Sequence, residues 1–129
     1  MQPKSPKWLD DIADACAFVM EITAGFSAAD YMAERRTRQA TERNIAIIGE
    51  ALIRLERTDP DTAARMTDYR AVIGLRNRIV HEYERIDNVQ VWTIIRNFLP
   101  ILHLEVTALL AEAERDLSAR ENQENEHAP

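Results

Sequence analysis

Apolar residues recur every three or four positions along most of the chain, and no segment alternates between apolar and polar residues. The first spacing is the period of a helix buried on one face, whereas alternation is the mark of a strand. The pattern predicts helices from Ser5 to Gly25 and over residues 27–36, 37–57, 68–83 and 87–117, with a short helical segment after Pro60. We expect an all-α fold, an antiparallel bundle of four or five helices.

Capping residues mark several of these helix ends. Ser5-Pro6 combines a capping hydroxyl with proline at the first helical position. Ser27 to Asp30 has the spacing of a capping box, and Asp87 is expected to cap the last helix while Gln90 reaches back to it. Pro100 removes a backbone donor inside that helix, so we expect a kink there.

The helical pattern ends near Leu117, which divides the chain into two parts. We assign residues 1–117 to one helical domain, long enough to bury a core of its own. Residues 118–129 are polar and acidic and have no apolar stripe, so we predict a disordered tail there.

Composition narrows the classes of function. The one cysteine, Cys16, lies among apolar neighbours and is expected to be a core residue rather than a reactive thiol. No Cys and His constellation indicates a metal site, so we expect neither metal nor cofactor. The N-terminus has no apolar leader and no apolar run reaches membrane-spanning length, so we expect a cytoplasmic protein with no membrane partner. A net charge of −6 disfavours loose nucleic-acid binding, so an RNA partner requires arginines that converge locally.

Three histidines each follow an arginine at short range, so that spacing discriminates poorly. His127 falls in the predicted tail, and His103 lies among apolar residues, which is more typical of a core histidine than of a catalytic one. His81 differs because polar residues surround it, in the segment Arg76-Asn77-Arg78-Ile79-Val80-His81-Glu82-Tyr83. We therefore take His81 as the candidate catalytic histidine.

Helical geometry arranges this segment. Arg76, Val80 and Tyr83 fall on one stripe, and Asn77 lies one turn before His81, where its amide can fix the tautomer of the imidazole. On a regular helix Arg76 and His81 point about 140° apart. They converge only if the helix is distorted near His81 or if a second copy faces the first, so a two-fold dimer interface is the natural place for a site.

The residue types fit RNA cleavage without a metal. His81 can act as general base or acid toward an RNA 2′-hydroxyl, Arg76 can stabilise the charge on the attacked phosphate, and Arg78 can hold a flanking phosphate. The alternative is that these residues form only a solvated helix face with ion pairs. Glu50 lies among apolar residues and needs a partner, either Arg43 or an arginine of the motif helix, and we favour a structural ion pair there.

The segment from Gly74 to Tyr83 closely resembles the HEPN superfamily and, within it, the HepT toxins that are paired with minimal nucleotidyltransferase antitoxins. Their motif is an arginine, four residues, a histidine, one residue and a tyrosine, and Arg76, His81 and Tyr83 match it without gaps. Residues 42–51 and 89–92 resemble the flanking helices of the family, so the resemblance covers about Ser5 to Leu117.

The resemblance implies a helical homodimer with metal-independent endoribonuclease activity on an RNA such as tRNA or mRNA. It also implies that the nucleotidyltransferase antitoxin transfers AMP to the motif tyrosine, here Tyr83. We therefore expect the toxin of a toxin–antitoxin pair. The alternative is a non-catalytic helical subunit that binds a nucleotide or a nucleotidyltransferase, which the acidic net charge favours.

Overall fold

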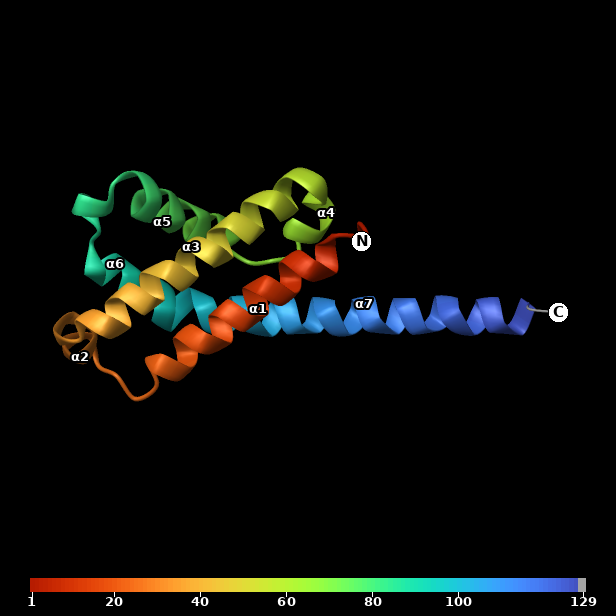
Figure 1. Cartoon of the computed structure of the whole chain (residues 1–129), viewed down its shortest axis with the longest axis horizontal. Coiled ribbons are helices and arrows are strands. Elements are labelled where there is room, and N and C mark those ends of the chain that lie inside the picture. Colours follow the sequence, from red (N-terminus) through yellow and green to blue (C-terminus); the bar gives the residue numbers. More distant parts are fainter. Residues whose placement is uncertain (128–129) are drawn as a thin grey trace.

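Four long helices within residues 1–127, namely α1, α3, α5 and α7, build the body of the protein, and successive ones run in alternating directions (Figure 1). The computed structural model describes residues 1–127, and that part contains no β-strand. The prediction of an all-α fold is confirmed. The elements are α1 (Ser5–Ile22), α2 (Ala28–Ala33), α3 (Arg35–Thr58), α4 (Pro60–Ala63), α5 (Tyr69–His81), a 3₁₀ turn (Tyr83–Arg85), α6 (Asn88–Thr93), a π-helical segment (Ile94–Phe98) and α7 (Leu99–His127).

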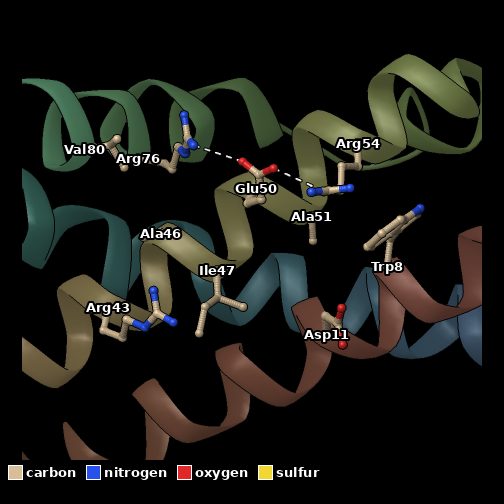
Figure 2. A pocket seen from close by; sticks show the side chains of 10 residues that line it. All are labelled: Trp8, Asp11, Arg43, Ala46, Ile47, Glu50, Ala51, Arg54, Arg76 and Val80. Carbon is tan, nitrogen blue, oxygen red and sulfur yellow. Dashed lines mark hydrogen bonds and ion pairs between the residues drawn. The ribbon is translucent and has the colours of Figure 1, made fainter.

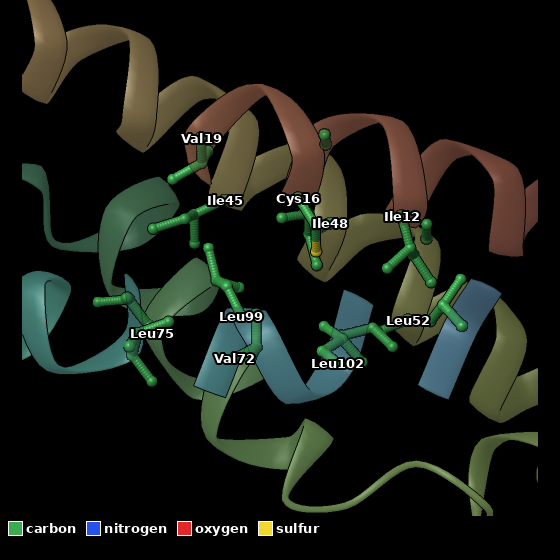
Figure 3. Close-up of a cluster of buried hydrophobic side chains, with 14 of the residues drawn as sticks. Ile12, Cys16, Val19, Ile45, Ile48, Leu52, Val72, Leu75, Leu99 and Leu102 are labelled. Carbon is green, nitrogen blue, oxygen red and sulfur yellow. The ribbon is translucent and has the colours of Figure 1, made fainter. Parts of the chain in front are cut away.

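The core lies around α3, which packs against α1 and α5, while α7 packs against α1. Cys16 is buried in this core, as predicted, and burial raises the pKa of its thiol to about 12, so the thiol stays protonated and unreactive at neutral pH. Figure 3 shows the apolar side chains that meet there, among them Ile12, Val19, Ile45, Ile48, Leu52, Leu99 and Leu102.

Two of the predicted caps are present. The Ser27 hydroxyl accepts from the Asp30 amide at 3.1 Å, and the Ser27 amide donates to the Asp30 carboxylate at 2.9 Å, which completes the capping box. Asp87 caps α6 as expected. Gln90 does not reach back to it, because its amide oxygen instead accepts a hydrogen bond from Nη1 of Arg78 at 2.8 Å.

Ser5 is not the cap of α1, which corrects the sequence prediction. The helix begins at Ser5 itself, and the buried Ser5 hydroxyl donates to the Asp59 carboxylate at 2.7 Å. Asp59 also accepts from the amide of Gln2 at 3.0 Å and from the Thr62 hydroxyl at 2.6 Å. Burial raises the pKa of Asp59, but these hydrogen bonds outweigh it and lower the pKa to about 2. One carboxylate thus ties the first turn of α1 to the junction of α3 and α4.

Acid should weaken this junction. Because the pKa of Asp59 is lower in the folded protein than in the unfolded chain, its stabilisation is complete above about pH 4 and is lost as pH falls toward about 2. The shift corresponds to about 2 kcal/mol of unfolding free energy. At pH 6 we expect urea unfolding of Asp59→Asn to show a loss of about that size, and the gap to wild type should close below pH 3. Asp61→Asn, at an exposed neighbour on α4, is the control. A gap that stays constant between pH 6 and pH 2 would contradict the assignment.

The predicted last helix is continuous but not regular. Its first turns form α6, then Ile94–Phe98 adopt π-helical geometry, and α7 begins at Leu99. Pro100 is the second residue of α7, two positions after this segment. It has no N–H to donate, and its ring crowds the carbonyl four residues back, which lies inside the segment. The wider π turn accommodates the proline, and it is the irregularity that the sequence predicts as a kink.

The end of α7 differs from the expected disordered tail. The helix continues from Ser118 to His127 and projects beyond the bundle (Figure 1), with the side chains of Glu114 to Glu126 exposed. Residues 118–127 contain neither proline nor glycine and include several strong helix formers, which explains the conformation. Residues 128 and 129, the rest of the predicted tail, lie outside the described residues.

By length and composition alone, Asn88–Glu126 is apolar enough to cross a membrane, contrary to the expectation that no segment reaches that length. In the structure the inner side of this segment belongs to the core, where Val91, Leu99, Leu102 and Val106 are buried. A core helix in a bundle can have the same composition, and packing buries 33% of the most apolar part of this segment.

Candidate active site

Arg76 lies in the middle of α5, and its side chain extends to Glu50 on α3 (Figure 2). Its Nη2 donates to Oε2 of Glu50 at 2.9 Å, and Nε of Arg54 donates to the other carboxylate oxygen at 3.1 Å. Of the two partners that the sequence leaves open for Glu50, the structure selects the arginine of the motif helix rather than Arg43.

The placement of Arg76 leaves one of its donors unpaired. Its side chain is only 18% exposed, and its Nε is buried without a hydrogen-bond partner. A buried donor left unpaired costs about 1–3 kcal/mol. The ion pair with Glu50 is therefore made at a cost in unfolding free energy that an apolar side chain at position 76 would not carry.

Gly49 makes room for Arg76. A Cβ at position 49 would overlap Cβ and Cγ of Arg76, so α5 can approach α3 this closely only because residue 49 has no side chain. The glycine lies one residue before Glu50, the ion-pair partner of Arg76. The position of the guanidinium therefore depends on a glycine that the helical pattern did not single out.

Asn77 supports Arg76 and not His81, which corrects the prediction. Its Oδ1 accepts from Nη1 of Arg76 at 3.0 Å, and among the described side chains no hydrogen bond joins it to His81. The amide oxygen of Asn77 lies beside a cation, and a hydrogen bond to a charged donor is the stronger one. The tautomer of the imidazole is therefore not fixed by Asn77.

His81 is the last residue of α5 and is exposed. The predicted stripe that continues to Tyr83 is wrong, because the helix ends at His81 and Tyr83 begins a 3₁₀ turn. After this turn the chain leaves the axis of α5. Ile86 packs against the core there, and Asp87 caps the next helix, α6. Arg76 faces α3 while His81 remains in solvent, so a single chain does not bring the two together.

Arg76 opens onto a hollow of about 390 Å³ between α1, α3 and α5. Three arginines and two acidic residues line it, together with the half-buried Trp8. Ile47 and Val80 also line the hollow and are 36% and 47% exposed, so both present apolar surface to solvent (Figure 2). The hollow combines cations with exposed apolar side chains.

Tyr83 lies over a second hollow, which it shares with Glu42 and Arg43 of α3. Its ring is 59% exposed. Burial raises the pKa of Glu42, although the charge of Arg38 and the hydroxyl of Tyr83 partly oppose this. Arg43 lines both hollows and thus lies between Arg76 and Tyr83.

Arg78 lies on a different side of α5 from Arg76. It faces α6 and donates to Gln90, and it lines a third hollow, between α5 and α6. Of the predicted site residues, the structure therefore groups Arg43, Glu50, Arg76 and Asn77, and sets Arg78 and His81 apart from them.

Sequence reasoning missed several residues of the hollows. Arg54 follows Glu50 by four residues, a spacing that signals an ion pair on a helix. Glu42 directly precedes Arg43 but has no distinctive signal of its own. Trp8 and Asp11 come from α1, and only the tertiary packing of α1 on α3 brings them to the site.

Three groups on α5 and the turn after it suit phosphate chemistry, although His81 lines none of the hollows described above. Arg76 offers a fixed guanidinium, His81 an exposed imidazole and Tyr83 an exposed phenol, all on α5 or the turn that follows it. Guanidinium groups bind phosphates, and imidazole moves protons near neutral pH. Among residues 1–127, no group of three His, Cys, Asp or Glu side chains could hold a metal ion. Fold and site together define an all-helical protein whose candidate site combines a fixed arginine with an exposed histidine and an exposed tyrosine.

Comparison with known proteins identifies the family. The family model described as Ribonuclease HepT-like matches residues 12–109, which include α3 and the segment from Arg76 to Tyr83. The chain belongs to this HEPN-type ribonuclease family, and an RNase is the function that membership supports.

Individual relatives agree with the family match. "Putative RNase TTE0752" of Caldanaerobacter subterraneus subsp. tengcongensis is 27% identical over 108 residues, covering 83% of this chain and 96% of that protein. "Putative RNase MJ1380" of Methanocaldococcus jannaschii is 29% identical over 99 residues, covering 77% and 90%. "Probable ribonuclease HepT" of Thermococcus cleftensis is 26% identical over 105 residues, covering 79% and 92%. No solved structure gives a significant match.

Proposed function

We propose that the protein is a metal-independent endoribonuclease, acting in the cytoplasm, whose active site is completed by a homodimer. The observation that carries this proposal is the contrast between two residues of α5. Arg76 is held by Glu50, whereas His81 is exposed and has no hydrogen-bond partner among the described side chains. Two copies related by a two-fold axis can join the arginine of one to the histidine of the other. Exposed Ile47 and Val80 beside Arg76 supply apolar surface for such an interface.

In this site His81 removes the proton of an RNA 2′-hydroxyl, and the resulting oxyanion attacks the adjacent phosphorus. The bond from phosphorus to the 5′-oxygen breaks, and the 5′-oxygen takes a proton from water. Arg76 stabilises the charge on the phosphate, and Glu50 keeps the guanidinium in place. The products are a 2′,3′-cyclic phosphate and a 5′-hydroxyl.

Purified protein tests this reaction directly. We expect cleavage of RNA in excess EDTA, with 2′,3′-cyclic phosphate and 5′-hydroxyl ends, and a dimer in analytical ultracentrifugation. Activity that disappears with EDTA and returns with a divalent cation would contradict metal independence. Full activity in a monomer would contradict the shared site.

We also infer that the protein is the toxin of a toxin–antitoxin pair, with a minimal nucleotidyltransferase as antitoxin. Tyr83 is the proposed target: its oxygen attacks the α-phosphorus of ATP, the phenol loses its proton, and pyrophosphate leaves. The exposure of Tyr83 and its position beside Arg43 support this, because a cation stabilises the added phosphate. The adduct adds negative charge and bulk close to the site of the RNA phosphate.

Modification of Tyr83 is expected to be visible by mass spectrometry. After co-expression with the nucleotidyltransferase and incubation with ATP, the intact mass should rise by one or more AMP units, and the modified protein should no longer cleave RNA. Tyr83→Phe should stay unmodified, and Tyr31→Phe, at a fully buried tyrosine, serves as the control. An unmodified wild-type protein under these conditions would count against this regulation.

A binding subunit without nuclease activity is the second candidate, and the net charge of −6 favours it because an acidic protein repels free RNA. Expression without the partner separates the two. Growth arrest with loss of intact tRNA or mRNA supports the toxin, whereas normal growth with tight nucleotidyltransferase binding supports the binding subunit.

A further inference from the structure

A groove of about 370 Å³ runs between α5 and the segment formed by α6 and the π-helical turn, away from the hollow that contains Arg76. Arg70 and Arg78 lie on its α5 side, and Phe98 and Val89 line the other side. None of the described residues that line it is acidic. In a protein of net charge −6, this groove is a local exception.

Gly74 lies in the wall of the groove, in the interior of α5. Glycine inside a helix costs about 0.5–1 kcal/mol relative to alanine. At Gly49 the packing of Arg76 explains that cost, but a Cβ on Gly74 would meet no atom of the described chain within 4 Å. Nothing in the fold requires Gly74 to lack a side chain. The glycine is explained if something from outside the chain approaches α5 at this point.

The groups around the groove indicate what approaches. Among the side chains that the structure describes, Arg78 bonds to the neutral amide of Gln90 and to no carboxylate, so its charge is not compensated there. Arg70 is largely exposed, and its ion pair with Glu56 is long at 3.6 Å. Phe98, Ile94 and Val89 add an apolar surface on the side of the groove opposite the two cations. Cations beside an apolar aromatic surface suit a ligand that combines a phosphate with a flat ring, which is a nucleotide.

The groove also leads toward His81. His81 follows Gly74 by seven positions, so the two lie within about 20° of each other around α5. Arg78 precedes His81 by three residues, about 4.5 Å along the helix axis. A strand of RNA lying in the groove would therefore reach the imidazole with its neighbouring nucleotide.

We propose that this groove binds one nucleotide of single-stranded RNA next to the cleaved bond, with its phosphate on Arg78 and Arg70 and its base against Phe98. The proposal rests on the ribonuclease function proposed above and adds a binding subsite to it. The subsite supplies affinity for RNA without touching the phosphate that is cleaved.

Two variants test the subsite, and both are made in an otherwise inactive His81→Ala protein so that binding is measured without cleavage. Gly74→Leu places a side chain in the groove, where a Cβ meets no atom of the described chain within 4 Å. Arg78→Gln removes a positive charge from the groove. The probe is a fluorescein-labelled RNA of twelve nucleotides, read by fluorescence anisotropy. We expect each variant to raise Kd about tenfold, and Arg78→Gln to reduce the salt dependence by about one phosphate contact. Ala108→Leu, which adds the same bulk at an exposed position of α7, should bind like the parent.

Cleavage kinetics separate the subsite from the function. With His81 intact, Gly74→Leu should raise KM for the same RNA and leave kcat within about twofold, and circular dichroism should show an unchanged fold. Unchanged Kd and KM in both variants, with an active wild type, would overturn the subsite alone. A wild-type protein that cleaves no RNA would overturn the function, while Kd in the inactive background still reports on the groove. The variants could also bind RNA normally but lose self-association or nucleotidyltransferase binding. That result would make the groove a protein-docking surface and overturn the proposal.

Discussion

Replacement of His81 by alanine is expected to lower RNA cleavage by about a thousandfold while leaving the fold intact. A positioned acid–base group typically contributes a factor of about 10² to 10⁴. The side chain is exposed and contributes no hydrogen bond among the described residues, so its removal should not change the melting temperature measurably. The rate of cleavage of a labelled RNA in EDTA, together with a thermal unfolding curve, measures both effects.

His103→Ala is the matched control, because it removes the same group from α7, where the side chain is half-buried and away from the motif. We expect this variant to cleave within about twofold of wild type. Retained activity in His81→Ala, or an equal loss in both variants, would remove His81 from the mechanism.

Gly49→Ala should damage both the fold and the site. The new methyl group overlaps Cβ and Cγ of Arg76, so α5 must move away from α3 or Arg76 must change its conformation. Overpacking of this kind costs about 1–3 kcal/mol, of which the better helix propensity of alanine returns about 0.5–1 kcal/mol. We expect a net loss of about 1–2 kcal/mol in unfolding free energy. Cleavage should fall at least as far as in Glu50→Gln, because Arg76 loses its position beside Glu50.

Alanine at the other helical glycine, Gly74, should change the unfolding free energy in the opposite direction. Gly74→Ala places its methyl group in open space, so it should stabilise the protein by about 0.5–1 kcal/mol. Chemical unfolding of the two variants side by side measures the contrast. Equal effects at positions 49 and 74 would mean that the close approach of Arg76 to α3 is not maintained in solution.

The helices are predictable from the sequence because their signals are local. Apolar spacing gives the ends of the first three long helices to within a few residues, and the capping box at Ser27 needs only side chains three residues apart. The end of α7 is missed by ten residues, because its last turns have no apolar stripe to mark them. The misassigned cap at Ser5 has a non-local cause: its hydroxyl is taken by Asp59, which is 54 residues away in sequence. The end of α5 at His81 also depends on the following turn, whose course is set by packing and by the cap of α6.

The site is predictable in its residue types but not in its geometry. The motif identifies Arg76 and His81, and it leaves open which groups they face. Asn77 illustrates the limit, because helical spacing allows it to meet either residue and only the turn of Arg76 toward α3 decides. The role of Gly49 was also beyond the sequence pattern, since it depends on the distance between two helices and not on the order of residues in one.

The two ends of the described chain lie away from the turn between α5 and α6 (Figure 1). Gln2 is anchored to Asp59 near α4, and the last turns of α7 project from the bundle into solvent. A fluorophore, an affinity handle or a surface tether attached at either end would therefore leave the segment from His81 to Tyr83 uncovered. The protein can be immobilised or labelled while RNA and a modifying enzyme retain access to it.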